Sequence, residues 1–134
     1  SQAGVEIDLI VRGICCLIPG QTYSRNIRVT RIVDTFLEHA RIWYFGNGGN
    51  PKLFLGSPDW MRRNLYRRIE AITPILDPDA KQELIDMLSI QLSDKRKACF
   101  VDENLRNCWK SAHPQKEKVR SQYTFYEYLK EKTE

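Results

Sequence analysis

Two strand patterns on either side of a polar turn lie in the stretch Ile27-Arg-Val-Thr-Arg-Ile-Val-Asp-Thr-Phe-Leu-Glu-His-Ala-Arg-Ile-Trp-Tyr-Phe45. Ile27–Val33 is rich in β-branched residues that alternate with polar ones, and Arg41–Phe45 is rich in residues that favour strands. The glycine-rich run Gly46–Pro51 and the apolar Lys52–Leu55 follow, which is the pattern of a hairpin. The stretch therefore predicts adjacent strands, with a short helical turn at Asp34–Glu38 between the first two.

Further strand patterns lie on both sides of this stretch. Val5–Val11 alternates at first and then becomes continuously apolar, as in a strand that enters the interior of a sheet. Asp59–Asn64 predicts a turn or short helix, and Tyr66–Ile72 predicts a strand that ends before Pro74. Lys97–Val101 indicates a late edge strand.

Two helices are expected in the second half of the chain. Asp77 is suited to cap a helix that begins at Pro78. Apolar residues then recur at helical spacing, at Leu84, Ile85, Leu88 and Leu92. Val119–Lys132 mixes aromatic and charged residues in the pattern of an amphipathic closing helix. Strands and helices in this order predict an α/β fold, a mixed-sheet α/β sandwich in which residues 1–134 form one domain.

The composition agrees with one compact soluble domain. Of the 134 residues, 42% are hydrophobic and 28% are charged. No apolar run approaches the roughly 18 residues of a membrane span, so we expect no transmembrane segment and a cytoplasmic protein. The chain begins with Ser1 rather than Met, and a strand pattern follows within a few residues. We therefore expect that it was cut from a longer protein.

The cysteines and arginines carry further information. Cys15, Cys16, Cys99 and Cys108 do not form a zinc-binding pattern, and the vicinal pair is predicted to be buried at a strand end. From Arg12 to Arg68 there are nine arginines and one lysine. Because a guanidinium grips phosphate oxygens in a planar fork, this half is where an anion should bind.

His39 stands immediately before a predicted strand, and the spacing of two places Arg41 on the same face. The run Gly56-Ser57-Pro58-Asp59, the pair Arg63-Asn64 and Glu70 follow in order. This set resembles a degenerate phospholipase D signature, in which a His-x-Lys pair, a Gly-Ser-x-Asn run and a glutamate line one phosphate pocket. A histidine can act as nucleophile or as general acid and base near neutral pH, and the cation beside it neutralises phosphate oxygens.

A closer resemblance covers nearly the whole chain. It rests on the following segments: Ile10-Val-Arg-Gly-Ile-Cys-Cys-Leu-Ile-Pro-Gly20, Asn26-Ile-Arg-Val29, Ile32-Val-Asp-Thr-Phe-Leu-Glu-His39, Phe45-Gly-Asn-Gly-Gly49 and Ser57-Pro-Asp-Trp-Met-Arg-Arg-Asn-Leu65. These segments resemble the last domain of polyphosphate kinase, a domain of phospholipase D-like type. Thr35, Gly46 and Arg62 stand where the family usually has Arg, Glu and Pro. The departures concern local loop shape.

The resemblance implies a single C-terminal catalytic domain, 1–134, of a kinase that reversibly transfers the terminal phosphate of ATP to inorganic polyphosphate. A phosphohistidine in the preceding domain would carry the phosphate, with magnesium bound outside this chain. By match to the family, Arg12 would contact the nucleotide phosphates. His39 would face the transferred phosphate as proton donor or charge stabiliser. Strand geometry adds Arg41 as a phosphate-binding residue.

The implied partners are ATP, ADP, polyphosphate, the remaining domains of the enzyme and, when full length, further copies in a homo-oligomer. Nucleic acid is not among them, and peripheral attachment to a membrane is left open. Two alternatives remain. One is a phosphodiesterase of the phospholipase D type, which would need a second His-x-Lys motif. The other is a non-catalytic module for polyanions or RNA, although Trp43, Tyr44 and Phe45 alternate faces, which does not favour a stacking platform.

Overall fold

The computed structural model describes residues 1–134, which divide into two compact units. The first unit comprises Ser1–Phe36 and Leu88–Glu134, and the second comprises Leu37–Met87. Each unit has its own sheet and is described by itself. The expectation that the chain acts as one domain stays a prediction.

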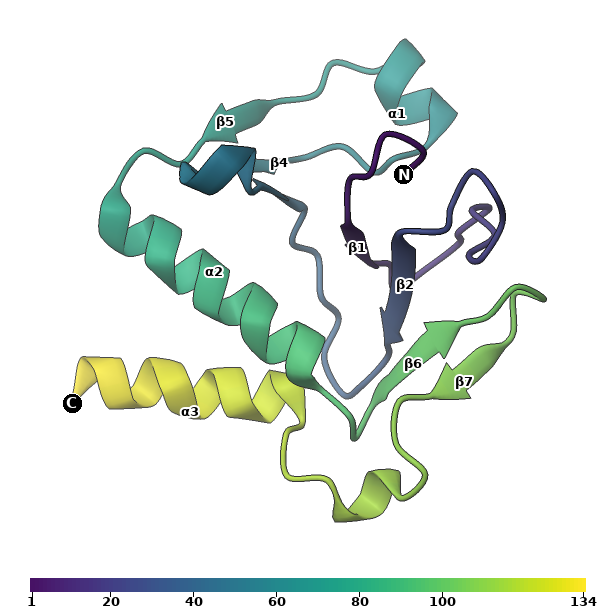
Figure 1. Ribbon diagram of the computed structural model, residues 1–134. Coiled ribbons are helices and arrows are strands. Elements are labelled where there is room, and N and C mark those ends of the chain that lie inside the picture. The colour runs from purple at the N-terminus through teal and green to yellow at the C-terminus, as the bar shows by residue number, and fades with distance from the viewer. The chain divides into compact units, whose positions relative to one another are not determined.

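The first unit contains a mixed four-stranded sheet in the order β1-β2-β6-β7 (Figure 1). Its strands are β1 (Ile7–Ile10), β2 (Ile27–Ile32), β6 (Ala98–Val101) and β7 (Asn107–Trp109). β1 and β2 run parallel, and the other two pairs are antiparallel. The predicted edge strand is therefore wrong in its position, because β6 lies between β2 and β7. β7 escaped prediction because all three of its residues are exposed and follow no burial pattern.

The core of the first unit is small and is completed by a buried carboxylate. Val29, Ile32, Ala98 and Val101 are its buried apolar residues. Asp94 is fully buried, and its oxygens accept hydrogen bonds from the backbone N–H groups of Arg96, Lys97 and Ser121, each at 2.8 Å. This carboxylate joins the start of helix α3 (Ser121–Thr133) to the segment before β6. The predicted closing helix is confirmed.

The second unit contains the antiparallel sheet β3-β4-β5, with β3 (Ile42–Phe45), β4 (Lys52–Gly56) and β5 (Ile72–Pro74). The predicted hairpin is confirmed, and its connection holds the short 3-10 turn η1 (Asn47–Gly49). Position 56 has no room for a residue with a side chain. A Cβ there would lie 2.8 Å from the carbonyl oxygen of Ala71 and 2.9 Å from the ring of Trp43.

Two local predictions are wrong. Tyr66 and Arg67, placed in a strand, belong to helix α1 (Arg62–Arg67), and β5 begins only at Ile72. The apolar residues of this segment are exposed in the structure and do not form the buried face of a strand. Asp34–Glu38 also forms no helical turn, because Asp34 is held instead by the guanidinium of Arg120 at 2.6 and 2.7 Å.

Helix α2 (Pro78–Ser93) begins as predicted. Asp77 Oδ1 accepts a hydrogen bond from the backbone N–H of Ala80 at 2.8 Å, which is an N-cap, and Pro78 is the first helical residue. No helix is long and apolar enough to span a membrane. The mixed α/β class is confirmed.

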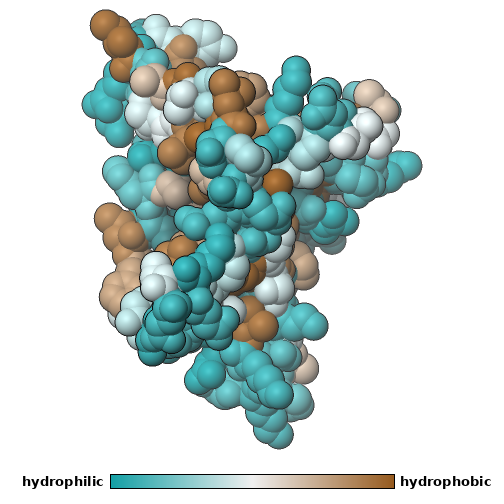
Figure 2. All heavy atoms as spheres, turned by 90° about the vertical axis from the view of Figure 1, so that its left-hand side faces the viewer, coloured by the Kyte–Doolittle hydropathy of each residue, from teal (hydrophilic) through white to brown (hydrophobic).

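Many large apolar side chains remain at the surface, as Figure 2 shows on one face. Trp60, Tyr66 and Ile69 are the most exposed around α1, at 74%, 80% and 104%. The predicted burial of the vicinal cysteines is wrong, because Cys15 is half-buried and Cys16 is exposed. Their segment leaves the sheet after β1, so neither thiol reaches the core.

Candidate phosphate site

His39 and Arg41 lie together in the second unit, on the segment that leads into β3. Arg41 Nη2 lies 3.2 Å from His39 Nε2, and Arg41 Nη1 donates to the carbonyl oxygen of His39 at 3.0 Å. The spacing of two therefore brings the two side chains to one side of the segment, as the sequence predicts.

Arg41 is anchored by a carboxylate from the other end of the hairpin. Asp59 Oδ1 accepts from Nε at 3.1 Å and from Nη2 at 2.8 Å. Four of the five N–H groups of this guanidinium are thus used within the chain, which leaves one on Nη1 for a ligand. The hydrogen bond and the charge of Arg41 lower the pKa of Asp59, with smaller contributions from the charges of His39 and Arg63. Asp59 is therefore an ionised anchor at neutral pH.

The bond to Arg41 decides how the His39 ring is oriented. A guanidinium can only donate, so His39 Nε2 accepts and the ring proton sits on Nδ1. His39 is exposed, and Nδ1 has no partner within the chain. The imidazole thus presents an N–H donor that is free to reach an oxygen of a bound anion.

A second cluster gathers around Glu70, with one partner that directly follows β4 and one within α1. Ser57 Oγ donates to Glu70 Oε2 at 2.5 Å, and Asn64 Nδ2 donates to Oε1 at 2.7 Å. Ser57 Oγ also accepts from the backbone N–H of Ala71 at 3.1 Å. The pKa of Glu70 is lowered by the hydrogen bonds from Ser57 and Asn64, and to a smaller extent by the charges of Arg68 and Arg41. Asn64 is buried, and its Oδ1 has no partner.

The residues of the phospholipase D-like signature are therefore together in the second unit. Arg41 links His39 to Asp59, while Ser57 and Asn64 both donate to Glu70. The sequence named these residues through their order. The sequence did not show that the carboxylates of Asp59 and Glu70 already accept hydrogen bonds from neighbouring side chains, because residue spacing carries no such information.

Arg12 belongs to the first unit, in the segment that follows β1. It is exposed, and its side chain makes no hydrogen bond or ion pair within the chain. All of its N–H donors are therefore available, in contrast to those of Arg41.

The residues of the chain do not fit a metal site. No group of three or more His, Cys, Asp or Glu side chains lies close enough together to hold a metal ion. The two carboxylates of the site, Asp59 and Glu70, already accept short hydrogen bonds from Arg41, Ser57 and Asn64. We therefore assign no metal ligand in this chain, and the magnesium expected with ATP stays a prediction.

Comparisons with known proteins show the family of this chain. The family described as "Polyphosphate kinase C-terminal domain 2" matches residues 1–122. The chain belongs to this family. It is 46% identical to a polyphosphate kinase of Escherichia coli over 131 residues, which are 97% of this chain and 19% of that protein. It is 59% identical to one from Synechocystis sp. over 99 residues, 73% of this chain and 14% of the relative.

Among solved structures, the crystal structure of the polyphosphate kinase from Porphyromonas gingivalis matches with a TM-score of 0.92 and 57% identity. The match covers 98% of this chain and 20% of that one. The expected phospholipase D-like α/β fold is thereby confirmed. The chain thus spans about a fifth or less of the polyphosphate kinases that it matches.

Proposed function

We propose that this domain forms part of a kinase that reversibly transfers the terminal phosphate of ATP to inorganic polyphosphate, through a phosphohistidine in a preceding domain. The single observation that supports it best is the family match over residues 1–122, to relatives named polyphosphate kinase. In this proposal the domain binds phosphate and stabilises charge, and the covalent carrier lies outside it.

His39 would act on the transferred phosphate through Nδ1. Its Nε2 is held by Arg41, so the free Nδ1–H is the group that can donate to a phosphate oxygen. A donor fixed in this way would stabilise the negative charge that develops on the moving phosphoryl group. In this role His39 would be a proton donor or a charge stabiliser.

Arg41 would assist mainly by position and charge. Its planar fork is occupied by Asp59 and His39, so it offers one N–H and a cation 3.2 Å from the His39 ring. Arg12 would make the stronger phosphate contact, because its guanidinium has no partner in the chain and can bind two oxygens at once. ATP, ADP and polyphosphate would be the ligands. Magnesium would arrive with the nucleotide and shield its phosphate charge.

The test compares this chain alone with the complete kinase. We expect the isolated chain to show no ATP-dependent polyphosphate synthesis, because the phosphate carrier is absent. Incubation with ATP labelled on the terminal phosphate should also leave it unlabelled. Acid-labile label on His39 of the isolated chain would contradict the proposed division of roles. Synthesis by the complete kinase is the positive control. That the full-length kinase is a homo-oligomer stays a prediction, as does any attachment of it to membranes.

A further inference from the structure

The segment that carries Arg12 has few attachments to the rest of the first unit. The ladder between β1 and β2 continues for one bond beyond β1, from the backbone N–H of Val11 to the carbonyl oxygen of Thr30 at 2.9 Å. Residues 12–18 then contain no regular structure, and the next firm attachment is at Ile18, whose carbonyl oxygen accepts from Ser24 Oγ at 2.6 Å. Arg12 itself makes no contact that would fix its direction.

Between these two attachments, the segment that carries Arg12 is held by a hydrogen bond from Arg31. Its Nη2 donates to the carbonyl oxygen of Gly13 at 3.2 Å, and its Nη1 donates to Oδ1 of Asn107 on β7 at 2.9 Å. One guanidinium therefore bridges the residue next to Arg12 and a strand 76 residues away in sequence. Since Arg31 starts from the middle of the sheet on β2, the bridge ties the segment to the most rigid part of the unit.

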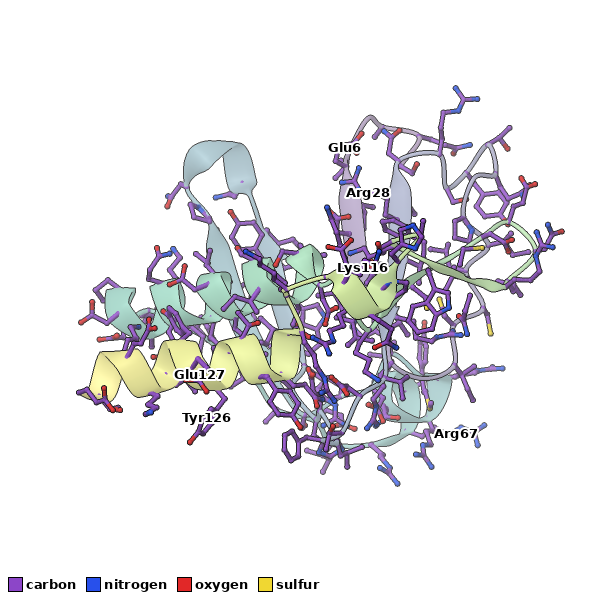
Figure 3. The ribbon with its side chains drawn as sticks, turned by 90° about the horizontal axis from the view of Figure 1, so that it is seen from below. Glu6, Arg28, Arg67, Lys116, Tyr126 and Glu127 are labelled. Carbon is purple, nitrogen blue, oxygen red and sulfur yellow. The ribbon has the colours of Figure 1, made fainter.

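The charge of Arg31 is not neutralised. It takes part in no ion pair, and its buried Nε has no hydrogen-bond partner. Arg28 on the same strand differs in this respect, because it pairs with Asp8 at 2.7 Å and with Glu6 at 3.5 Å (Figure 3). Within the chain, the Arg31 guanidinium is therefore held only by its bonds to Gly13 and Asn107.

We propose that Arg31 is a positioning residue for ATP binding. Through Gly13 it holds the Arg12 segment in the conformation that presents the Arg12 guanidinium to the nucleotide phosphates, and it needs Asn107 as its second anchor. The proposal rests on the proposed function of Arg12. It adds a residue that acts by positioning Arg12.

The test measures steady-state kinetics of the complete kinase. Arg31→Ala is expected to raise the KM for ATP about ten-fold, which is the loss of one hydrogen bond from a charged group. Asn107→Ala should raise it less, in the same direction. Arg28→Ala removes the same charge from the same strand and should leave the KM for ATP unchanged. A thermal melt of each variant monitors the fold. If Arg31→Ala fails to fold, the exposed position Asn107 decides the question alone.

Two further variants separate positioning from other roles. In the double variant with Arg12→Ala, Arg31→Ala should add little to the KM, because it acts through Arg12. Arg31→Lys keeps the charge but loses the planar fork that reaches two acceptors, so most of the defect should remain.

Independent effects in the double variant, full recovery with lysine, or an unchanged KM in both Arg31→Ala and Asn107→Ala would each overturn the proposal. An unchanged KM in Arg12→Ala would instead refute the proposed function.

Discussion

Replacement of His39 by alanine in the complete kinase is expected to lower kcat about 100-fold or more, with the KM for ATP within about two-fold of the original. The proposed role uses the imidazole while charge moves on the phosphate, so its loss raises the barrier to transfer and leaves binding intact. A 100-fold loss corresponds to about 2.7 kcal/mol, at 1.36 kcal/mol for each factor of ten.

The structure limits what this substitution can do to the fold. His39 is exposed, and its ring makes one hydrogen bond, to Arg41 at 3.2 Å. Such a bond contributes about 1 kcal/mol or less to stability. Arg41 keeps both bonds to Asp59 and the bond to the backbone oxygen of residue 39, which alanine also provides. A rise of about 2.7 kcal/mol in the barrier would therefore exceed the effect of losing this one bond.

The assay is polyphosphate synthesis at saturating polyphosphate with ATP varied. His39→Gln keeps a hydrogen-bond donor and cannot titrate. If it restores most of kcat, His39 stabilises charge, and if it is as inactive as alanine, His39 transfers a proton. His113→Ala is the matched control, since that histidine is also exposed and lies outside the site. Near-normal kcat in His39→Ala, or an equal loss in His113→Ala, would refute the reasoning.

Three further substitutions test other contacts. Arg12→Ala should raise the KM for ATP and also lower kcat, because a guanidinium there would hold phosphate in the ground and transition states; varied-ATP kinetics would show both. Arg120→Ala should destabilise the chain by roughly 2 kcal/mol in urea, because it leaves the nearly buried Asp34 carboxylate without its main partner. Arg120 lowers the pKa of Asp34. The difference in free energy of unfolding between the original chain and Arg120→Ala should therefore be largest at neutral pH and should shrink below about pH 4. Asp77→Ala should lower the free energy of unfolding by about 1 kcal/mol, because it removes the N-cap of α2; urea unfolding measures this, with Asp79→Ala as the control.

The elements predicted correctly are those in which local pattern and burial agree. The α2 start at Asp77 and Pro78 follows from capping chemistry, and the hairpin follows from the glycine-rich run Gly46–Pro51 between two β-rich segments. Tyr66–Ile72 failed for the opposite reason. Its apolar residues are exposed in the structure, and the chain there ends α1 before it reaches β5.

For the site, the sequence alone was sufficient to place His39 and Arg41 on one side, because alternation along an extended segment is a local property. The order of the motif also selected Asp59 and Glu70. Only the tertiary structure decided that Asp59 takes two N–H groups of Arg41 and that Arg41 Nη2 contacts His39 Nε2, which assigns the His39 tautomer. It also decided that Arg31 reaches both Gly13 and Asn107. Such bonds join residues far apart in sequence, and their geometry depends on strand order and register, which no local pattern encodes.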